Sequence, residues 1–294
     1  MWNFSETEIK ECPSFQDGIS QQSIDIYRFK GCELIERLAA VFRLPKLSVA
    51  SAKVFFHRFY VVQSFKRQDA WLIAATCLFL AAKVEEHYMK AVDFSKHYLA
   101  YRRKLSHDAK KACGDGVFPV ESATPPTVQA QTDELLFTEC IVLHVLAYDL
   151  GVVHPHGYVN EFVSLGLTHM DVSTDTAMEL KRAAWSFLND SSNTCLCLRF
   201  EPRVITAAAV YLAGHYLSHW TEPLTTNGSQ KWWAATSIPV GVLQDAAKGL
   251  LETYIKGYMY KKKPLPSGIV RLLHLHGLPN PCKDKTEGDR VTSA

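Results

Sequence analysis

The chain has 294 residues, of which 47% are hydrophobic and 21% are charged. This length and balance are typical of one large or two medium globular domains with a substantial core. A formal net charge of +2 at pH 7 excludes a global field that would draw the whole chain to nucleic acid or to an acidic membrane.

The first half of the sequence predicts a series of helices. Ser5 and Glu8 have the spacing of a capping box for a short helix that ends near Pro13. Asp69 is an N-cap candidate for a helix from Ala70 to Lys83 that is apolar on every side, so we expect this helix to lie at the centre of its domain. The helices between are indicated by apolar residues at helical spacing: Ile24, Tyr27, Leu34, Leu38 and Phe42, then Val49, Ala52, Phe56, Phe59 and Tyr60.

Gly, Pro, Ser and Thr are frequent from Ser106 to Gln131, which predicts a long surface loop. Thr132-Asp133-Glu134 then starts an amphipathic helix, Leu135 to Leu146, with the acidic residues in its first turn. The second half predicts helices near Tyr158 to Leu165, Ala177 to Leu188 and Arg203 to Leu217, another opening at Trp232-Trp233, and a last one after Pro239. Beyond Lys263 the composition predicts a largely mobile tail.

An internal repeat organises these helices. Residues 74–82 align with residues 206–214, and an aromatic-rich helix precedes each copy. The repeat predicts two related domains, at residues 1–150 and 151–260, and a basic and then flexible tail at residues 261–294.

The cysteines and the N-terminus indicate a soluble intracellular protein. The eight cysteines form no CxxC pair, and Cys195 and Cys197 lack a second pair at zinc-ligand spacing. Cys77 and Cys140 lie in apolar helical runs, where cysteine behaves as a small hydrophobic residue. The N-terminus lacks a signal-peptide pattern, and the longest apolar stretch, Ala70 to Ala82, is shorter than the ~20 residues that cross a bilayer.

No residues predict catalysis, a metal site or a cofactor. His154-Pro155-His156 and His274-Leu275-His276 lack acids or cysteines at ligand spacing. The sequence also lacks a Gly-rich phosphate loop, a G-x-S-x-G elbow and an H-E-x-x-H motif. An independent enzyme is therefore not expected.

Three segments of the first half closely resemble a cyclin box: His57-Arg58-Phe59-Tyr60, Gln63-Ser64-Phe65 and the LFLAAKVEE run from Leu78 to Glu86. The residues of these segments are similar to those of the transcriptional cyclins T and K. Trp2-Asn3-Phe4 and His154-Pro155-His156 also look like this subgroup. The segments of the second half that are similar to cyclin K are Trp185 to Ser191, Glu201-Pro202 and Val210 to Gly214. The resemblance covers residues 2–256, and the choice between cyclin T and cyclin K stays open.

The resemblance implies an all-α fold of two tandem five-helix cyclin-box repeats, with a short N-terminal helix and a mobile C-terminal tail. It implies a nuclear regulatory subunit that binds and activates a transcriptional cyclin-dependent kinase and thereby promotes transcription elongation. The substrate would be the Ser/Thr-rich tail of RNA polymerase II, and ATP and magnesium would bind to the kinase.

By the same resemblance, Lys83 and Glu139 are the family's pair that contacts kinase backbone near the αC helix. Glu86 and Tyr148 match positions at the kinase interface of cyclin T, where a Phe stands in place of Tyr148. The loop from Ser106 to Gln131 is longer than in cyclin T, so no contact is carried over to it.

Two further residues match structural positions of the family: Arg28 of the first long helix, and Leu72, a packing position. The segment from Tyr27 to Gly31 lacks the apolar patch by which cell-cycle cyclins recruit substrates. His57 stands where those cyclins carry Asp. Both departures favour the transcriptional subgroup.

Two alternatives remain. One is a cyclin-fold transcription factor of the TFIIB type that binds DNA, although the sequence lacks a zinc ribbon and an extended basic face. Lys261, Lys262 and Lys263 form only a local cluster, which suits a solvated helix end or a weak RNA contact. The other alternative is a cyclin that binds its kinase without activating it.

Overall fold

The structure is a computed structural model that describes residues 2–111, 127–167, 174–218 and 232–282. All regular elements in these residues are α-helices or 3-10 helices. The chain divides into two compact units, residues 2–152 and the residues from 153 onward. These findings confirm the all-α fold.

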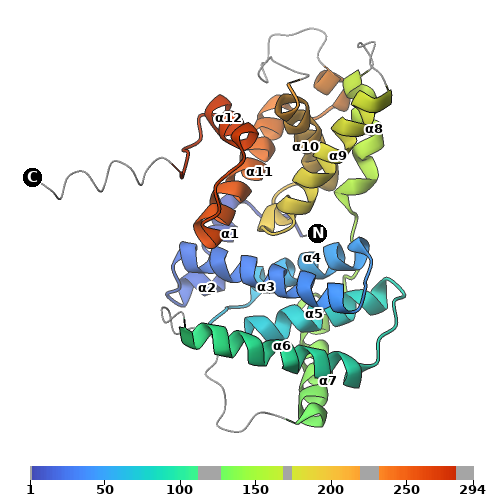
Figure 1. Ribbon diagram of the computed structural model, residues 1–294, viewed down its shortest axis with the longest axis vertical. Helices are drawn as coiled ribbons and strands as arrows, with labels where there is room; N and C mark the ends of the chain where they lie inside the picture. Colours follow the sequence, from blue (N-terminus) through green and yellow to red (C-terminus); the bar gives the residue numbers. More distant parts are fainter. Residues whose placement is uncertain (1, 112–126, 168–173, 219–231, 283–294) are drawn as a thin grey trace, which may run out of the picture. The chain divides into compact units, whose positions relative to one another are not determined.

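The first unit contains seven helices in its described residues (Figure 1). Their bounds are α1 Glu6–Lys10, α2 Pro13–Gln16, α3 Gln21–Val41, α4 Lys46–Val62, α5 Ala70–Val84, α6 Ala91–Lys111 and α7 Val128–Val145. The capping box of α1 is confirmed, because the Ser5 hydroxyl accepts from the Glu8 N–H and the Glu8 carboxylate accepts from the Ser5 N–H.

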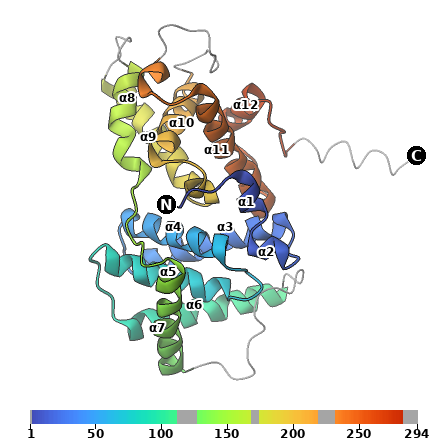
Figure 2. The same ribbon diagram turned by 180° about the vertical axis from the view of Figure 1, so that it is seen from behind.

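Helix α5 is the centre of the first unit. Every residue from Leu72 to Ala82 is buried, and the helix packs against α3, α4, α6 and α7 (Figures 1 and 2). The Asp69 carboxylate accepts a hydrogen bond of 2.9 Å from the Trp71 N–H at the start of α5, which satisfies one of the free donors of the first turn. The predicted cap and the predicted central position are both confirmed.

The second unit is built around α10 in the same way. Its elements are η1 Pro155–Tyr158, α8 Val159–Leu167, α9 Thr174–Ser191, η2 Cys195–Leu198, α10 Pro202–Tyr216, η3 Trp232–Thr236, α11 Val240–Lys261 and α12 Ser267–Leu275. All residues of α10 from Ile205 to His215 are buried, and α8, α9, α11 and α12 pack against it. The two segments aligned by the internal repeat are thus the central helices of their own units.

The connection between α6 and α7 is shorter than predicted. Helix α6 continues to Lys111, and α7 begins at Val128 after an N-cap at Thr127, whose hydroxyl accepts from the Ala130 N–H at 3.1 Å. Residues 106–111 and 127–131 carry no Gly or Pro that would interrupt a helix, so the predicted loop bounds at Ser106 and Gln131 are wrong. Residues 112–126 lie outside the described residues.

The prediction of a mobile tail is wrong for the residues of α12. Three apolar side chains at helical spacing, Ile269, Leu272 and Leu273, are buried in the second unit. Gly268 permits a close approach, since a Cβ there would lie 2.4 Å from Cε2 of Tyr216. Burial of this apolar stripe offsets the entropy of ordering the segment. Residues 283–294, the rest of the predicted tail, lie outside the described residues.

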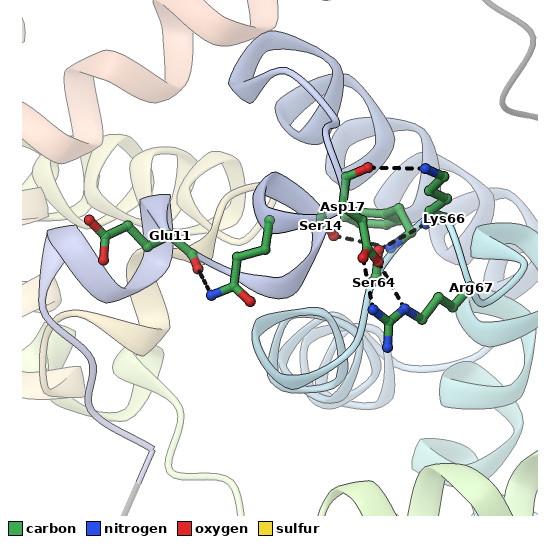
Figure 3. A network of polar contacts seen from close by, with 8 residues as sticks. Glu11, Ser14, Asp17, Ser64, Lys66 and Arg67 are labelled. Atoms are coloured by element: carbon green, nitrogen blue, oxygen red, sulfur yellow. Dashed lines mark hydrogen bonds and ion pairs between the residues drawn. The ribbon is translucent and has the colours of Figure 1, made fainter.

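A polar network joins α2 to the loop after α4 (Figure 3). Asp17 accepts two hydrogen bonds from the Arg67 guanidinium, at 2.8 and 2.9 Å, and this contact, with the Ser64 hydroxyl, lowers the pKa of the Asp17 carboxyl. The buried Ser14 hydroxyl accepts from the Phe65 N–H at 3.0 Å. The Phe65 ring stacks on Tyr60 with centroids 3.7 Å apart, so the network fixes a loop that contributes to the core.

We predict that Ser14→Ala lowers the free energy of unfolding by about 1–3 kcal/mol, because the buried Phe65 N–H loses its acceptor. Urea denaturation of the purified protein measures this change. Thr7→Ala, at an exposed position of α1, is the control and should leave the midpoint nearly unchanged. Equal midpoints for the Ser14 variant and the unsubstituted protein would show that the Phe65 N–H finds another acceptor.

Candidate functional site

Lys83 and Glu139 meet at the surface of the first unit. Lys83 lies in the last turn of α5 and Glu139 lies near the middle of α7, and Nζ of Lys83 is 2.5 Å from Oε1 of Glu139. The Glu139 side chain is only 9% exposed, whereas the Lys83 side chain is 40% exposed. The nearly buried carboxylate therefore holds a cation whose other N–H groups are available at the surface.

Phe79 fixes the position of the ammonium further. Nζ of Lys83 lies 4.8 Å from the centroid of the Phe79 ring, one helical turn earlier in α5, within the range of a cation–π contact. An ammonium held by a carboxylate and a ring in this way is already ordered for donating hydrogen bonds to the carbonyl oxygens of a partner.

Glu86 lies in the cap that ends α5. The Glu86 N–H donates to the Lys83 carbonyl at 3.1 Å, and the His87 N–H donates to the Ala82 carbonyl at 2.7 Å, which is the Schellman pattern. This pattern requires a left-handed residue, and Glu86 has φ 60°. Gly is usual at this position because a side chain there costs about 1–2 kcal/mol. The Glu86 carboxylate is thus exposed, and the backbone of the residue that carries it is strained.

Tyr148 lies in the corresponding cap of α7. The Ala147 and Tyr148 N–H groups donate to the His144 and Leu143 carbonyls, both at 3.0 Å. Ala147 and Tyr148 have φ 50° and 58°, so two consecutive residues with side chains are left-handed. The Tyr148 side chain is 60% exposed, and its hydroxyl lies 3.5 Å from Nε2 of His144, a contact too long for a strong hydrogen bond.

Helix α7 buries polar residues and exposes apolar ones. Its buried residues include Gln131, Thr132, Thr138 and Glu139, while Leu136 is exposed and Phe137 is 69% exposed. Exposed positions follow one another along the helix and its cap, and we call them the α7 stripe: Phe137, Cys140, His144 and Tyr148. An exposed apolar surface beside an ordered charge is typical of a protein-binding site.

Two exposed residues of the α7 stripe are not predicted as site residues from the sequence: Phe137 and Cys140. The apolar run around Cys140 predicts that it behaves as a small hydrophobic residue, but it is exposed because it lies one helical turn after Phe137 on the uncovered side of α7. The same expectation holds for Cys77, which is completely buried and whose thiol pKa is raised by that burial. The signal that could have found Phe137 is its position outside the spacing of the buried residues Leu135 and Val142.

Arg28 and Leu72 are both buried in the first unit. Arg28 of α3 reaches α4, where its Nη2 donates to the Tyr60 carbonyl at 3.2 Å and its Nη1 lies 3.2 Å from Nδ1 of His57. Neither residue lies at the exposed surface that carries Lys83, so the geometry is compatible with the scaffold role that the sequence predicts for them.

The other sequence candidates lie in the second unit. Lys261, Lys262 and Lys263 are exposed at the end of α11, where cations interact favourably with a helix C-terminus. Nε2 of His156 lies 3.1 Å from Oδ1 of Asn189, and burial lowers the His156 pKa. Among the described residues, no group of His, Cys, Asp or Glu is arranged to hold a metal ion, and no helix is long and apolar enough to cross a membrane.

Comparison with known families gives the fold and the site a context. The family described as "Cyclin, N-terminal domain" matches residues 1–151, which include every residue of the Lys83 site and the α7 stripe. The chain belongs to the cyclin family. The resemblance of the first half to a cyclin box is therefore confirmed.

The relatives with similar sequences include cyclins of the T and K types, which agrees with the subgroup that the sequence resembles. The chain is 31% identical to Cyclin-T1-5 of Arabidopsis thaliana over 86% of this chain and 41% of that protein. It is 32% identical to Cyclin pch1 of Schizosaccharomyces pombe over 72% of this chain and 57% of that protein. It is 28% identical to Cyclin-K of Homo sapiens over 87% of this chain and 41% of that protein. The chain thus spans about half the length of these relatives.

Solved structures share the fold at low sequence identity. A chain of the yeast RNA Pol II CTD kinase CTDK-1 complex matches with a TM-score of 0.68 and 17% identity, over 95% of this chain and 84% of that chain. A chain of the CAK complex from Chaetomium thermophilum matches with a TM-score of 0.61 and 15% identity, over 99% of this chain and 92% of that chain. At such identity the likeness establishes the fold alone.

We predict that Glu86→Gly raises the free energy of unfolding by up to about 1 kcal/mol, because relief of the left-handed strain exceeds the flexibility that Gly adds to the unfolded chain. Arg43→Gly is a matched control, since Arg43 has φ 51° in the same kind of cap at the end of α3. Thermal unfolding of both variants measures the gain. A loss of stability in Glu86→Gly alone would mean that its side chain stabilises the isolated cyclin.

Proposed function

We propose that this cyclin is the regulatory subunit of a transcriptional cyclin-dependent kinase, which it binds and activates. The observation that carries the proposal is the arrangement on α5 and α7. The Lys83 ammonium at the end of α5 is ordered by the nearly buried Glu139 carboxylate of α7, and α7 and its cap also expose Phe137 and Tyr148 to solvent. This surface has an apolar part to bury and a charged part to give the partner its register.

In the proposed complex, Lys83 and Glu139 contact backbone groups of the kinase near its αC helix, and Glu86 and Tyr148 support them. A kinase is active when a Lys–Glu ion pair and a metal-holding Asp are in place, and the position of αC controls the ion pair. The cyclin binds the αC-in state better than the αC-out state and thereby shifts the population toward the active state. The cyclin itself supplies no catalytic residue, and ATP and magnesium bind to the kinase.

The proposed substrate of the complex is the tail of RNA polymerase II, and the proposed location is the nucleus, where the complex promotes transcription elongation. The names of the relatives support this assignment: cyclins T and K among the sequences, and an RNA Pol II CTD kinase complex among the structures. A TFIIK complex that contains Kin28, Ccl1 and Tfb3 gives a further match of the fold, with a TM-score of 0.58.

The nucleic-acid alternative has a weaker basis. Its candidate contacts, Lys261, Lys262 and Lys263, lie at one helix end, and the rest of the chain carries no matching excess of positive charge. A non-activating cyclin would still need the Lys83 site. The kinase measurements below separate it from the proposed activator.

We expect the double variant Lys83→Met, Glu139→Gln to bind the kinase about 2–5 kcal/mol more weakly, because the kinase groups that pair with these charges are left desolvated. This corresponds to a Kd raised roughly 30-fold or more. The substitutions remove both charges together, so neither is left unpaired, and Met keeps an apolar stem on Phe79. Phosphorylation of an RNA polymerase II tail peptide by purified transcriptional kinases, with and without the cyclin, measures activation.

Lys96→Ala is the control for this experiment, because Lys96 forms an exposed ion pair with Asp93 outside the site. It should activate as the unsubstituted cyclin does. Binding without stimulation by the unsubstituted cyclin would support the non-activating alternative. Equal stimulation by the double variant would remove Lys83 and Glu139 from the interface, and salt-sensitive RNA or DNA binding without kinase binding would favour the nucleic-acid alternative.

Cys140 provides a chemical footprint of the interface. We predict that iodoacetamide modifies Cys140 in the free cyclin and that bound kinase protects it, because the kinase would cover the α7 stripe. Cys77 should be unmodified in both states, since its thiol is buried and its pKa is raised. Mass spectrometry follows each site, with the half-buried Cys282 of the second unit as the control. Unchanged labelling of Cys140 in a saturated complex would place the kinase elsewhere.

A further inference from the structure

Asp149, the residue after Tyr148, is held by two residues that are distant in the sequence. The Trp2 indole N–H donates to Oδ2 of Asp149 at 3.1 Å, and Nη1 of Arg58 donates to the Asp149 backbone carbonyl at 2.9 Å. The Arg58 guanidinium also lies over the Trp2 ring, 5.3 Å from its centroid. We call these three residues the N-terminal clasp: Trp2, Arg58 and Asp149.

The clasp holds both the side chain and the backbone of Asp149. Its backbone carbonyl is bound from α4, its carboxylate is bound from the N-terminal segment, and the cation–π contact ties these two partners to each other. In the turn that follows α7, the Asp149 N–H donates to the Leu146 carbonyl at 2.9 Å. The residue directly after Tyr148 is therefore fixed at its N–H, its carbonyl and its side chain.

Tyr148 needs such support because its backbone is strained. Tyr148 follows a left-handed Ala147 and is itself left-handed, a conformation that a bulky residue keeps only when its surroundings impose it. Its own side chain is 60% exposed and contacts only His144 in the described residues, by ring centroids 5.4 Å apart and by the long contact of the hydroxyl. The cap holds Tyr148 at its N–H, which donates to the Leu143 carbonyl, and Asp149 restrains the backbone on the other side of Tyr148.

We propose that the N-terminal clasp positions Tyr148 for the kinase, so that Trp2 and Arg58 are positioning residues of the binding site although neither belongs to α5 or α7. This inference rests on the proposed function. Without the clasp, the segment after α7 relaxes from its left-handed conformation, and Tyr148 must be ordered again on binding. Preorganisation of an interface residue contributes to affinity because that ordering has already occurred in the free protein.

A double-mutant cycle tests the proposal. Trp2→Phe keeps a smaller aromatic ring for Arg58 and removes the N–H that binds Asp149. We expect it to raise the Kd for the kinase about fivefold or more, the usual range of coupling between sites. In a Tyr148→Ala background the same substitution should have no further effect, because no ring is left to be positioned. Titration of each cyclin variant onto the purified kinase measures the four values.

Conservative variants separate positioning from general stability. Asp149→Asn keeps an oxygen that accepts from Trp2, so it should bind the kinase nearly as the unsubstituted cyclin does. Asp149→Ala should behave like Trp2→Phe. Trp185→Phe, at an exposed position of the second unit, controls for the loss of an indole N–H. All variants are compared at a temperature at which thermal unfolding shows them to be folded.

The outcomes separate this inference from the proposed function. Weaker binding of Trp2→Phe that disappears in the Tyr148→Ala background supports the clasp. The same loss of affinity in both backgrounds, or no loss in either, overturns it while the kinase assignment stands. Failure of the unsubstituted cyclin to bind any transcriptional kinase overturns the proposed function and this inference with it.

Discussion

The burial of α5 on every side is the constraint from which the site follows. A helix without a polar side must be surrounded, and α3, α4, α6 and α7 surround it over Leu72 to Ala82. Lys83 is the next residue, and there the burial ends. The cation consequently reaches the surface where α7 packs against α5, and Glu139 of α7 lies within an ion-pair distance of it. The packing of the core thus determines where the charge of Lys83 lies.

Helix α7 has buried polar residues and exposed apolar residues. It covers α5 with Thr138 and Glu139 in its buried set and leaves Phe137 exposed, which is unfavourable for an isolated protein. The caps of α5 and α7 add left-handed residues with side chains. Such local losses of stability are common at binding sites, because a bound partner buries the exposed apolar surface and pairs with the ordered charge. Removal of the exposed apolar side chain or of the left-handed side chains is therefore expected to stabilise the free cyclin and to lower its affinity for the partner.

The two units show how one architecture is specialised. In the alignment of residues 74–82 with residues 206–214, the positions of Lys83 and Glu86 correspond to His215 and Ser218. Ser218 keeps the left-handed cap, with φ 62°, but His215 is buried inside the second unit. The repeat thus conserves the central helix and the way it ends, whereas only the first copy places a cation at the surface. A kinase-binding role for the first unit is consistent with this difference.

The sequence by itself determined the helical class, the central position of α5, the repeat of its segment in α10, and the caps at Ser5 and Asp69, because periodicity and capping are local properties of the chain. It also pointed, through resemblance, to Lys83 and Glu139. Only the tertiary structure decided that Glu139 is buried, that Phe137 and Cys140 are exposed, that residues 267–275 form a packed helix, and that Trp2 meets Asp149. A periodic pattern tells which residues of a helix are apolar, but which side is covered depends on neighbouring helices that are distant in the sequence.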